Sequence, residues 1–400
     1  MDKNALYYTA PYQKEFDAEV LSCTEKAGQY LIVLDRNGFY PEGGGQPADT
    51  GSIGRARVLD VREDTASGLI LHRTDLPLAP GEKVHCTIDW QKRFRNMQNH
   101  SGEHIISGLI HRHYGFDNVG FHMGDVITID FNGAIGRELL MRIEAEANAV
   151  VCEDREIRIL YPSAEELPQW DYRSKKELNG TVRLVEIEGA DLCACCGTHV
   201  RRTGEIGVIK LLSAVSHRGG TRIEMTAGLD AAADYDRKHR MLLEAARMLS
   251  VKPEELTDAL RQYKAESAAK DLRIAALNER YFRSVLKELP DSEETVSVFE
   301  EGLNPIELRK LCDLLVKNGK GRVVAAFAPK TQPAEVQPGS DAGAAFEYMY
   351  VIGSRSLDVR EGGKRLNALL SGRGGGSAEM LQGSVRASEG KIREILPQIF

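Results

Sequence analysis

The sequence predicts a multidomain α+β protein, and three observations indicate this. Residues 1–90 contain short β-rich runs separated by Gly, Asp and Pro, which is typical of a small β-barrel or compact sheet. Residues 91–228 mix helical and strand-like segments, and residues 291–400 form another α/β pattern. Residues 229–290 are rich in Ala, Leu, Arg, Glu and Lys, which predicts a helical linker. A chain of 400 residues is long enough for several such domains.

The composition argues against several classes of protein. Lys and Arg number 52 against 59 Asp and Glu, a net charge of −7, whereas coating nucleic acid nonspecifically requires a dense cationic surface. No run approaches the roughly 18 apolar residues of a membrane span, and the charged N-terminus is unlike a signal peptide. We therefore expect a cytoplasmic protein. Seven cysteines, an odd number that includes Cys193, Cys195 and Cys196, favour reduced thiols over a disulfide framework.

The first candidate site is a loop after the second predicted strand, residues 30–34. This glycine loop, Phe39-Tyr-Pro-Glu-Gly-Gly-Gly-Gln46, contains three consecutive glycines followed by a glutamine. Taken alone, a flexible turn is as good an interpretation of three glycines as a functional loop.

The second domain begins near residue 91, where the pattern predicts a helix over residues 97–113. The apolar side of this helix consists of Met97, Ile105, Leu109 and Ile110. A second helix is predicted over residues 137–154, with strands over 126–131 and 182–187. The cysteine-rich segment follows the last of these strands, which places it in the same domain.

Two pairs of side chains with metal-ligand chemistry occur at a spacing of four residues. His100 and His104 lie one turn apart on the predicted helix, so both imidazoles can reach one metal ion. A histidine pair at this spacing is more often structural when it stands alone. The second pair, Cys195 and His199, lies on a turn opened by Gly197. Three nitrogens and one sulfur make a plausible tetrahedral zinc set.

A second interpretation starts from the same helix. The segment His100-Ser-Gly-Glu-His104 matches the H-x-x-E-H signature of inverted zinc peptidases, in which Glu103 would be the base. A peptidase needs a third, usually acidic, ligand from a downstream helix. The candidates are Glu144, Glu146 and Glu153. Spacing alone does not decide between the two interpretations, although the peptidase leaves the Cys195/His199 pair and the glycine loop without a role.

The second half of the chain predicts a helical hairpin over residues 229–290, interrupted near Pro253, and then an α/β unit. In that unit, helices are predicted over 305–317 and 360–370, and strands over 322–327 and 346–352. A glycine-rich run over residues 372–376 lacks the GK[ST] ending of a Walker loop, although its backbone amides could cradle a phosphate.

These motifs, in this order, resemble the editing half of alanyl-tRNA synthetase and the free-standing AlaX-type editing proteins. The resemblance rests on the glycine loop, Asp89-Trp90, Met97-Gln-Asn-His100 with His104, Cys195-Cys-Gly-Thr-His199, and Arg222-Ile-Glu. It continues into a C-terminal glycine-rich module similar to the C-Ala, or DHHA1, domain. The resemblance implies a β-barrel (1–90), a zinc-containing editing domain (91–228), a helical hairpin linker (229–290) and a DHHA1-like α/β domain (291–400).

The resemblance also implies an activity and the residues that carry it. The activity is hydrolysis, in trans, of the ester between a wrong amino acid and tRNA(Ala), with serine as the main substrate and glycine as a second. Zinc is assigned to His100, His104, Cys195 and His199, and substrate contact to Gly44, Gly45, Gln46 and Arg222. Gln46 and Glu103 are the catalytic candidates, although Glu103 is charged where the family suggests an uncharged residue. Because the barrel starts close to Met1, we expect no aminoacylation domain.

Four protein ligands leave two routes open for the water that attacks the ester. Either one ligand yields its position on zinc, or zinc only positions the substrate and Gln46 or the glycine-loop amides stabilise the reaction.

Contact with RNA is expected at basic residues in two segments, 195–225 and 351–400, where Lys and Arg outnumber Asp and Glu. The candidates are Arg201, Arg202, Lys210 and Arg373. The expected partner is mischarged tRNA(Ala), and a homodimer through the C-terminal domain is a further expectation. A non-catalytic tRNA-binding protein is the remaining alternative.

Overall fold

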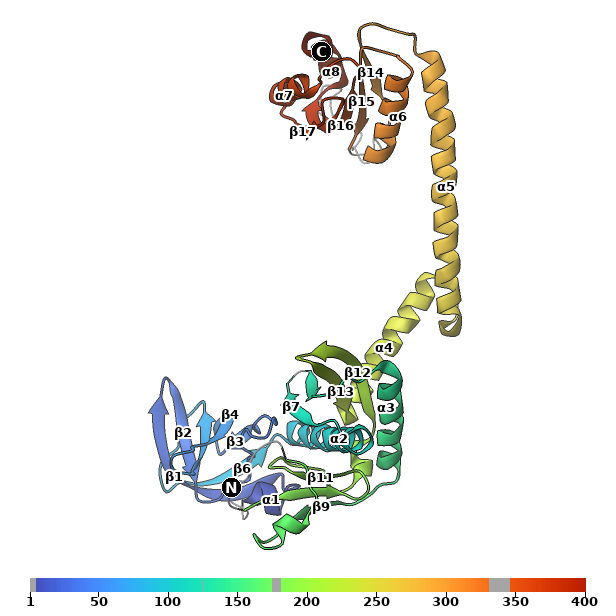
Figure 1. The fold of residues 1–400 in the computed structure, drawn as a ribbon. Coiled ribbons are helices and arrows are strands. Elements are labelled where there is room, and N and C mark those ends of the chain that lie inside the picture. Colours follow the sequence, from blue (N-terminus) through green and yellow to red (C-terminus); the bar gives the residue numbers. More distant parts are fainter. Residues whose placement is uncertain (1–4, 125, 175–180, 331–345) are drawn as a thin grey trace. The chain divides into compact units, whose positions relative to one another are not determined.

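The computed structural model describes residues 5–124, 126–174, 181–330 and 346–400. The chain divides into two compact units, Met1–Met248 and Leu249–Phe400 (Figure 1), and each is treated by itself below. The predicted multidomain α+β architecture is confirmed. No helix in the described part of the chain is long and apolar enough to cross a membrane.

The first unit starts with a closed barrel in which all neighbouring strands are antiparallel. Its strands, in the order β1-β2-β5-β4-β3-β6, are β1 (Glu15–Lys26), β2 (Gln29–Leu34), β3 (Gly51–Ile53), β4 (Ala56–Glu63), β5 (Ile70–Thr74) and β6 (Lys83–Ile88). A short helix α1 (Leu6–Thr9) precedes it. Alternate residues of β1 and β6 point into one apolar core, as the period of two requires. The predicted barrel is therefore confirmed.

A long helix, α2 (Trp90–Tyr114), follows the barrel and carries the candidate histidines. The Asp89 side chain caps it by accepting a hydrogen bond from the Lys92 amide at 3.2 Å, and Gly115, with φ +67°, ends it. The predicted apolar side is buried, but so is the polar side, because every residue from 96 to 110 is buried. A helix with polar groups buried on all sides must satisfy them within the protein, which points to a site around it.

Two sheets and a helix pack around α2. One sheet has the order β12-β13-β8-β7 and the other β11-β10-β9. Their bounds are β7 (Asn118–Met123), β8 (Ile127–Phe131), β9 (Ile157–Leu160), β10 (Leu184–Ile187), β11 (Asp191–Ala194), β12 (Ile209–His217) and β13 (Gly220–Ala227). The helices of this region are α3 (Arg137–Cys152), α4 (Gly228–Met248) and the short η1 (Leu167–Gln169) and η2 (Thr203–Ile206). The part of the cysteine-rich segment at Cys193 is itself a strand, because Asp191–Ala194 pairs with β10.

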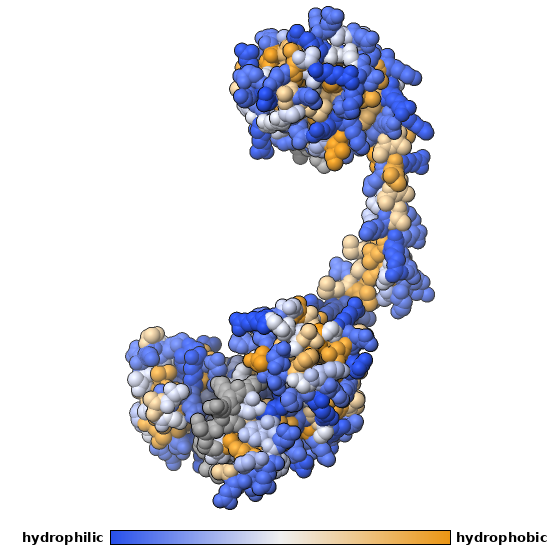
Figure 2. Space-filling model, viewed as in Figure 1, coloured by the Kyte–Doolittle hydropathy of each residue, from blue (hydrophilic) through white to orange (hydrophobic). Residues whose placement is uncertain are grey.

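The second unit has a five-stranded sheet in the order β14-β15-β16-β18-β17. Its elements are η3 (Pro253–Glu255), α5 (Leu256–Glu288), β14 (Thr295–Phe299), α6 (Pro305–Lys317), β15 (Val323–Pro329), β16 (Phe346–Gly353), α7 (Arg360–Leu369), β17 (Arg373–Gly376), β18 (Met380–Ala387) and α8 (Glu389–Ile399). Helix α6 covers one face, and α7 and α8 cover the other. Along α5, apolar side chains such as Leu260 and Leu272 are exposed. Figure 2 shows hydrophobic residues on the surface of this helix.

The helices and strands predicted for residues 305–370 are confirmed within three residues at each end. The glycine-rich run is different from the prediction, because residues 373–376 form strand β17 and pair with β18. A Cβ at Gly374 would lie 2.5 Å from the Tyr350 hydroxyl, so glycine there allows two backbones and a ring to approach closely. The predicted hairpin helices, α4 and α5, belong to different units. Their pairing and the four-part division of the chain stay predictions.

A buried ion pair fixes the barrel against α2. Arg93 donates through Nε to both carboxylate oxygens of Asp49, at 3.0 and 2.9 Å, and both side chains are 0% exposed. The remaining guanidinium nitrogens donate to the carbonyl oxygens of Gly38 and Pro11, at 2.7 and 3.0 Å. Because Asp49 follows the glycine loop and Arg93 lies on α2, this pair aligns the loop with the helix.

We expect Asp49→Asn to lower the free energy of unfolding of the first unit by about 3–5 kcal/mol, because it leaves the Arg93 charge buried without a counter-charge. Urea denaturation followed by tryptophan fluorescence measures this, since both tryptophans, Trp90 and Trp170, lie in the first unit. The matched control is Glu82→Gln, which breaks the exposed Arg55–Glu82 pair of the same barrel and should cost less than about 1 kcal/mol. Equal losses in both variants would contradict a special role for the buried pair.

Candidate metal centre

Four predicted ligands come together at one point beside α2. His100 and His104 project from the helix, and Cys195 and His199 come from the loop that follows β11. One ligand atom from each residue lies within 4.8 Å of the others. The two histidine rings of the helix and the ring of His199 are mutually in contact, with centroids 4.6–5.3 Å apart.

Each imidazole is held by an oxygen on its outer nitrogen. Nδ1 of His100 lies 2.9 Å from Oε1 of Gln46, Nδ1 of His104 lies 2.8 Å from Oδ2 of Asp191, and Nδ1 of His199 lies 3.3 Å from Oγ of Ser101. An amide oxygen and a carboxylate accept only, so His100 and His104 each carry a proton on Nδ1 and turn Nε2 toward the cluster. This outer support is the arrangement that metal-binding histidines require.

One inner nitrogen has no hydrogen-bond partner. Nε2 of His199 is buried and unsatisfied among the residues that the structure describes. An orphaned buried nitrogen normally costs free energy, and a metal ion at the centre of the donors would satisfy it. Cys195 Sγ, 3.4 Å from Nε2 of His100, completes a set of three nitrogens and one sulfur, which fits zinc.

The electrostatics of the cluster place a thiolate at Cys195 beside a protonated His104, and a metal ion could take the place of the proton on Nε2. Burial alone would raise the pKa of Cys195, but His100 and His104 hold the pKa of this thiol well below its ordinary value. Burial opposes protonation of His104, yet Cys195 and then Asp191 raise its pKa to about 10. Burial keeps the pKa of His199 well below its ordinary value. A thiolate among buried imidazoles is thus ready to bind a metal.

The glycine loop is an ordered turn beside this cluster. Gly43 and Gln46 exchange two backbone hydrogen bonds of 3.0 and 3.1 Å, and the two residues between them, Gly44 and Gly45, have φ +59° and +82°. Positive φ at both central positions of a tight turn favours glycine strongly. The Gly45 carbonyl also accepts from the Met123 amide at 3.0 Å. The three glycines therefore form a defined tight turn that contacts β7 through Met123.

Gln46 is buried, and both the oxygen and the nitrogen of its side-chain amide form hydrogen bonds. Its Oε1 accepts from the Thr198 amide at 3.1 Å in addition to His100, and its Nε2 donates to the Thr198 hydroxyl at 2.9 Å. The side chain thus connects the barrel, α2 and the Cys195–His199 loop. Gly197 leaves the space for this contact, because a Cβ there would lie 2.0 Å from Cε1 of His100 and 3.0 Å from Oε1 of Gln46.

Glu103 is buried rather than solvated. It accepts hydrogen bonds from Ser107, at 2.7 Å, and from Asn118, and its Oε2 lies 4.0 Å from Nε2 of His104. Cys193 is buried on β11 and Cys196 is exposed beside the cluster. The acidic residues that a peptidase would need are engaged elsewhere: Glu144 pairs with Lys210, Glu146 with His113 and Glu153 with Arg155.

Two family models match the chain in the regions that build this site. The model described as "Threonyl and Alanyl tRNA synthetase second additional domain" matches residues 182–224, and "tRNA synthetases class II (A)" matches residues 2–92. The alanyl-tRNA editing protein AlaX-L of Pyrococcus horikoshii is 36% identical over 239 residues, which are 56% of this chain and 58% of that protein.

Alanine–tRNA ligases are similar over longer stretches. The enzyme of Ignicoccus hospitalis is 34% identical over 70% of this chain, and that of Methanopyrus kandleri is 32% identical over 98% of it. The chain belongs to the alanyl-tRNA synthetase editing-domain family. It spans 32% and 44% of the length of these two ligases. Among solved structures, the C-Ala domain of Aquifex aeolicus alanyl-tRNA synthetase matches 26% of the chain and 88% of its own length, at 26% identity and a TM-score of 0.21.

Arg222 and the predicted RNA contacts lie outside the cluster. Arg222 is on β13, where it forms a bidentate salt bridge with Asp130: Nε donates to Oδ1 at 2.6 Å and Nη2 donates to Oδ2 at 2.7 Å. Among the RNA candidates, Arg202 pairs with Asp154 and Lys210 with Glu144. Arg201 stacks over the Tyr12 ring at 4.2 Å, and Arg373 is exposed on β17. Two of the four predicted cations are therefore already neutralised by carboxylates.

Sequence reasoning missed four residues that support the candidate metal ligands directly or through another side chain, and these are Ser101, Arg173, Asp191 and Thr198. A signal for one of them was present. Asp191 and Cys193 lie two residues apart on one face of β11, and Cys195 follows two residues after the strand's last inward position, which makes Asp191 a neighbour of the predicted ligand. Arg173 and Ser101 have no comparable local signal.

Replacing Gly197 by Ala should reduce zinc affinity by roughly 10–100-fold, because the new methyl group displaces His100 and Gln46 together. Zinc competition with a chromogenic chelator measures this. The control is Gly136→Ala at the start of α3, where a Cβ meets nothing within 4 Å and φ is −82°. Unchanged zinc affinity in Gly197→Ala would contradict the crowding argument.

Proposed function

We propose that this protein is an aminoacyl-tRNA deacylase that hydrolyses mischarged tRNA(Ala). The observation that carries the proposal is the cluster of His100, His104, Cys195 and His199 beneath a glycine loop whose Gln46 holds one of the histidines. Its membership of the editing-domain family supports the same reaction. The zinc dependence, the ligand set and the identity of the removed amino acid are parts of this proposal.

The chemistry divides between the metal and the side chains around it. When bound, zinc supplies a Lewis acid that polarises the ester carbonyl and lowers the pKa of water. Gln46 orients His100 through its amide oxygen and is itself held by the Thr198 hydroxyl. The amides of Gly44 and Gly45, exposed at the rim, are the donors proposed for the developing oxyanion. Glu103, buried 4.0 Å from His104 Nε2, is the proposed proton acceptor.

Serine is the amino acid that such a site can select. A polar group that pairs with the serine hydroxyl is left unsatisfied by alanine, so Ser-tRNA(Ala) is favoured over Ala-tRNA(Ala). Glycine lacks even the methyl group, and a difference of that size changes binding by only about 1–3 kcal/mol. We therefore propose serine as the main substrate and glycine as a less selective one.

Deacylation should be fastest with Ser-tRNA(Ala), slower with Gly-tRNA(Ala) and slowest with Ala-tRNA(Ala), and a chelator should abolish it. Cys195→Ala should lose zinc and slow hydrolysis of Ser-tRNA(Ala) by about 100-fold or more. Cys196→Ala, which removes the adjacent exposed thiol, is the matched control and should keep both. Release of labelled amino acid measures the rates, and metal analysis measures the zinc.

Three results would overturn parts of this proposal. Ala-tRNA(Ala) cleaved as fast as Ser-tRNA(Ala) would exclude proofreading. Cleavage of a generic peptide that depends on Glu103 would favour a zinc peptidase. Tight binding of tRNA(Ala) without turnover of any ester would favour a non-catalytic tRNA-binding protein.

The second unit is proposed to contribute tRNA affinity and a dimer interface rather than chemistry. A second compact unit that follows the first along the chain can raise the effective concentration of tRNA when it binds tRNA itself. A chain ending at Met248 should therefore bind tRNA(Ala) about tenfold more weakly or worse, with an unchanged single-turnover rate at saturating tRNA. Filter binding and rapid quench measure the two quantities. Sedimentation of both chains tests the dimer, and equal tRNA affinity would remove the second unit from RNA binding.

A further inference from the structure

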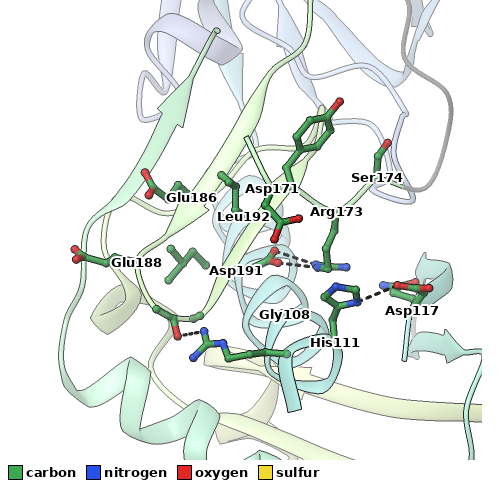
Figure 3. A pocket seen from close by; sticks show the side chains of 16 residues that line it. Gly108, His111, Asp117, Asp171, Arg173, Ser174, Glu186, Glu188, Asp191 and Leu192 are labelled. Carbon is green, nitrogen blue, oxygen red and sulfur yellow. Dashed lines mark hydrogen bonds and ion pairs between the residues drawn. The ribbon is translucent and has the colours of Figure 1, made fainter. Parts of the chain in front are cut away.

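One of the ligand histidines is connected to a buried ion pair that no motif indicates. Nδ1 of His104 lies 2.8 Å from Oδ2 of Asp191, and Arg173 donates to the same carboxylate through Nε, at 2.7 Å to Oδ1, and through Nη2, at 2.9 Å to Oδ2. Figure 3 shows the Arg173 guanidinium meeting Asp191 on the wall of a pocket of about 520 Å³. This pocket lies on the side of Asp191 occupied by Arg173, between β11 and the end of α2.

The three side chains are almost fully enclosed. The exposed fractions of the side chains are 2% for His104, 1% for Asp191 and 11% for Arg173. The backbone of Arg173 is also fixed, because its amide donates to the Leu192 carbonyl and its carbonyl accepts from the Ala194 amide, both at 2.9 Å. The Arg173 guanidinium is therefore held against Asp191, because the backbone of Arg173 is hydrogen-bonded to β11.

Helix α2 approaches Asp191 closely at one glycine. Gly108 lies one turn after His104, and a Cβ there would lie 2.2 Å from the Ala190 carbonyl oxygen and 2.6 Å from Cβ of Asp191. Any larger residue at this position would push β11 away from the helix. Gly108 therefore sets the distance at which the carboxylate can reach the His104 ring.

Asp191 and Cys193 could themselves act as ligands, because with His104 they form a second group whose ligand atoms lie within 4.8 Å of one another. The contacts favour a different role for Asp191. Both carboxylate oxygens already accept from a guanidinium, and one also accepts from His104. A cation added there would have to displace Arg173, whereas an acceptor role leaves every contact in place.

We infer that Asp191 is a positioning residue for the metal centre, and that Arg173 acts through it by locking the carboxylate in the orientation that holds His104. The inference rests on the proposed zinc site. Asp191 fixes which nitrogen of His104 carries the proton and raises the basicity of the other nitrogen, so the carboxylate, histidine and metal form a connected series. Arg173 prevents Asp191 from turning away from the ring.

Asp191→Ala should weaken zinc binding by about 10–100-fold, the scale of losing an outer partner of a ligand histidine. Chelator competition on the full chain measures the affinity, and the visible spectrum of the Co²⁺-substituted protein reports the geometry of the ligands. The matched control is Glu186→Gln, which breaks the Arg158–Glu186 pair on the neighbouring strand β10. The control should keep the parent zinc affinity and the parent Co²⁺ spectrum.

Arg173→Met tests the second half of the inference. It should also weaken zinc binding, and the double variant Asp191→Ala/Arg173→Met should bind zinc no more weakly than Asp191→Ala alone, because Arg173 acts through the carboxylate. Additive losses would overturn this coupling. Circular dichroism of each variant checks that a change in affinity is not a loss of folding.

The outcomes separate this inference from the proposed function. If the parent binds zinc, and Asp191→Ala binds it with the same affinity and shows the same Co²⁺ spectrum, only the positioning role is overturned. Zinc lost in Cys193→Ser but retained in Cys195→Ala would show that the second group holds the metal, and Asp191 would then be a ligand. A parent protein that binds no zinc would overturn both the metal centre and the inference.

Discussion

A histidine binds a metal through one nitrogen while a hydrogen-bond partner holds the other, and the first unit of this protein supplies such a partner to each of the three histidines in the candidate metal centre. Gln46, Asp191 and Ser101 each hold one histidine, and they come from the barrel, from β11 and from α2. Two of these partners, Gln46 and Asp191, lie outside α2, which explains why this part of the helix is enclosed by the barrel loop and by β11. They also explain why its polar residues are buried.

The dependence on acceptors accounts for the small residues at the centre of the unit. Gly197 and Gly108 lie where the chain must approach a histidine or its acceptor within a distance that excludes a methyl group. Neither glycine is needed for a turn with positive φ, since neither appears among the residues with such backbone angles. Their role is close approach, which differs from the role of Gly44 and Gly45 in the glycine loop.

The sequence predicted much of the fold and the inner part of the site. Spacing of four along a helix and along a turn placed His100 with His104 and Cys195 with His199, because local geometry decides those pairs. The order of the motifs then indicated that the two pairs belong together. The outer residues were harder to predict. Arg173 and Asp191 are joined by pairing between segments 18 residues apart, and Gln46 meets Thr198 across 152 residues. Propensity and period carry no information about such contacts, and the burial of the polar side of α2 was missed for the same reason.

The Asp49–Arg93 ion pair also affects the geometry of the candidate metal centre, because both residues lie close in sequence to Gln46 and His100. Asp49 lies three residues after Gln46, and Arg93 lies seven residues, about two helical turns, before His100. The pair therefore sets the registration of the barrel against the helix within a short span of the contact that orients His100. Functional groups of this kind must be held within about 0.5 Å of their working positions. The contact between the barrel and α2 thus helps to position the candidate metal ligands, although neither Asp49 nor Arg93 is one of them.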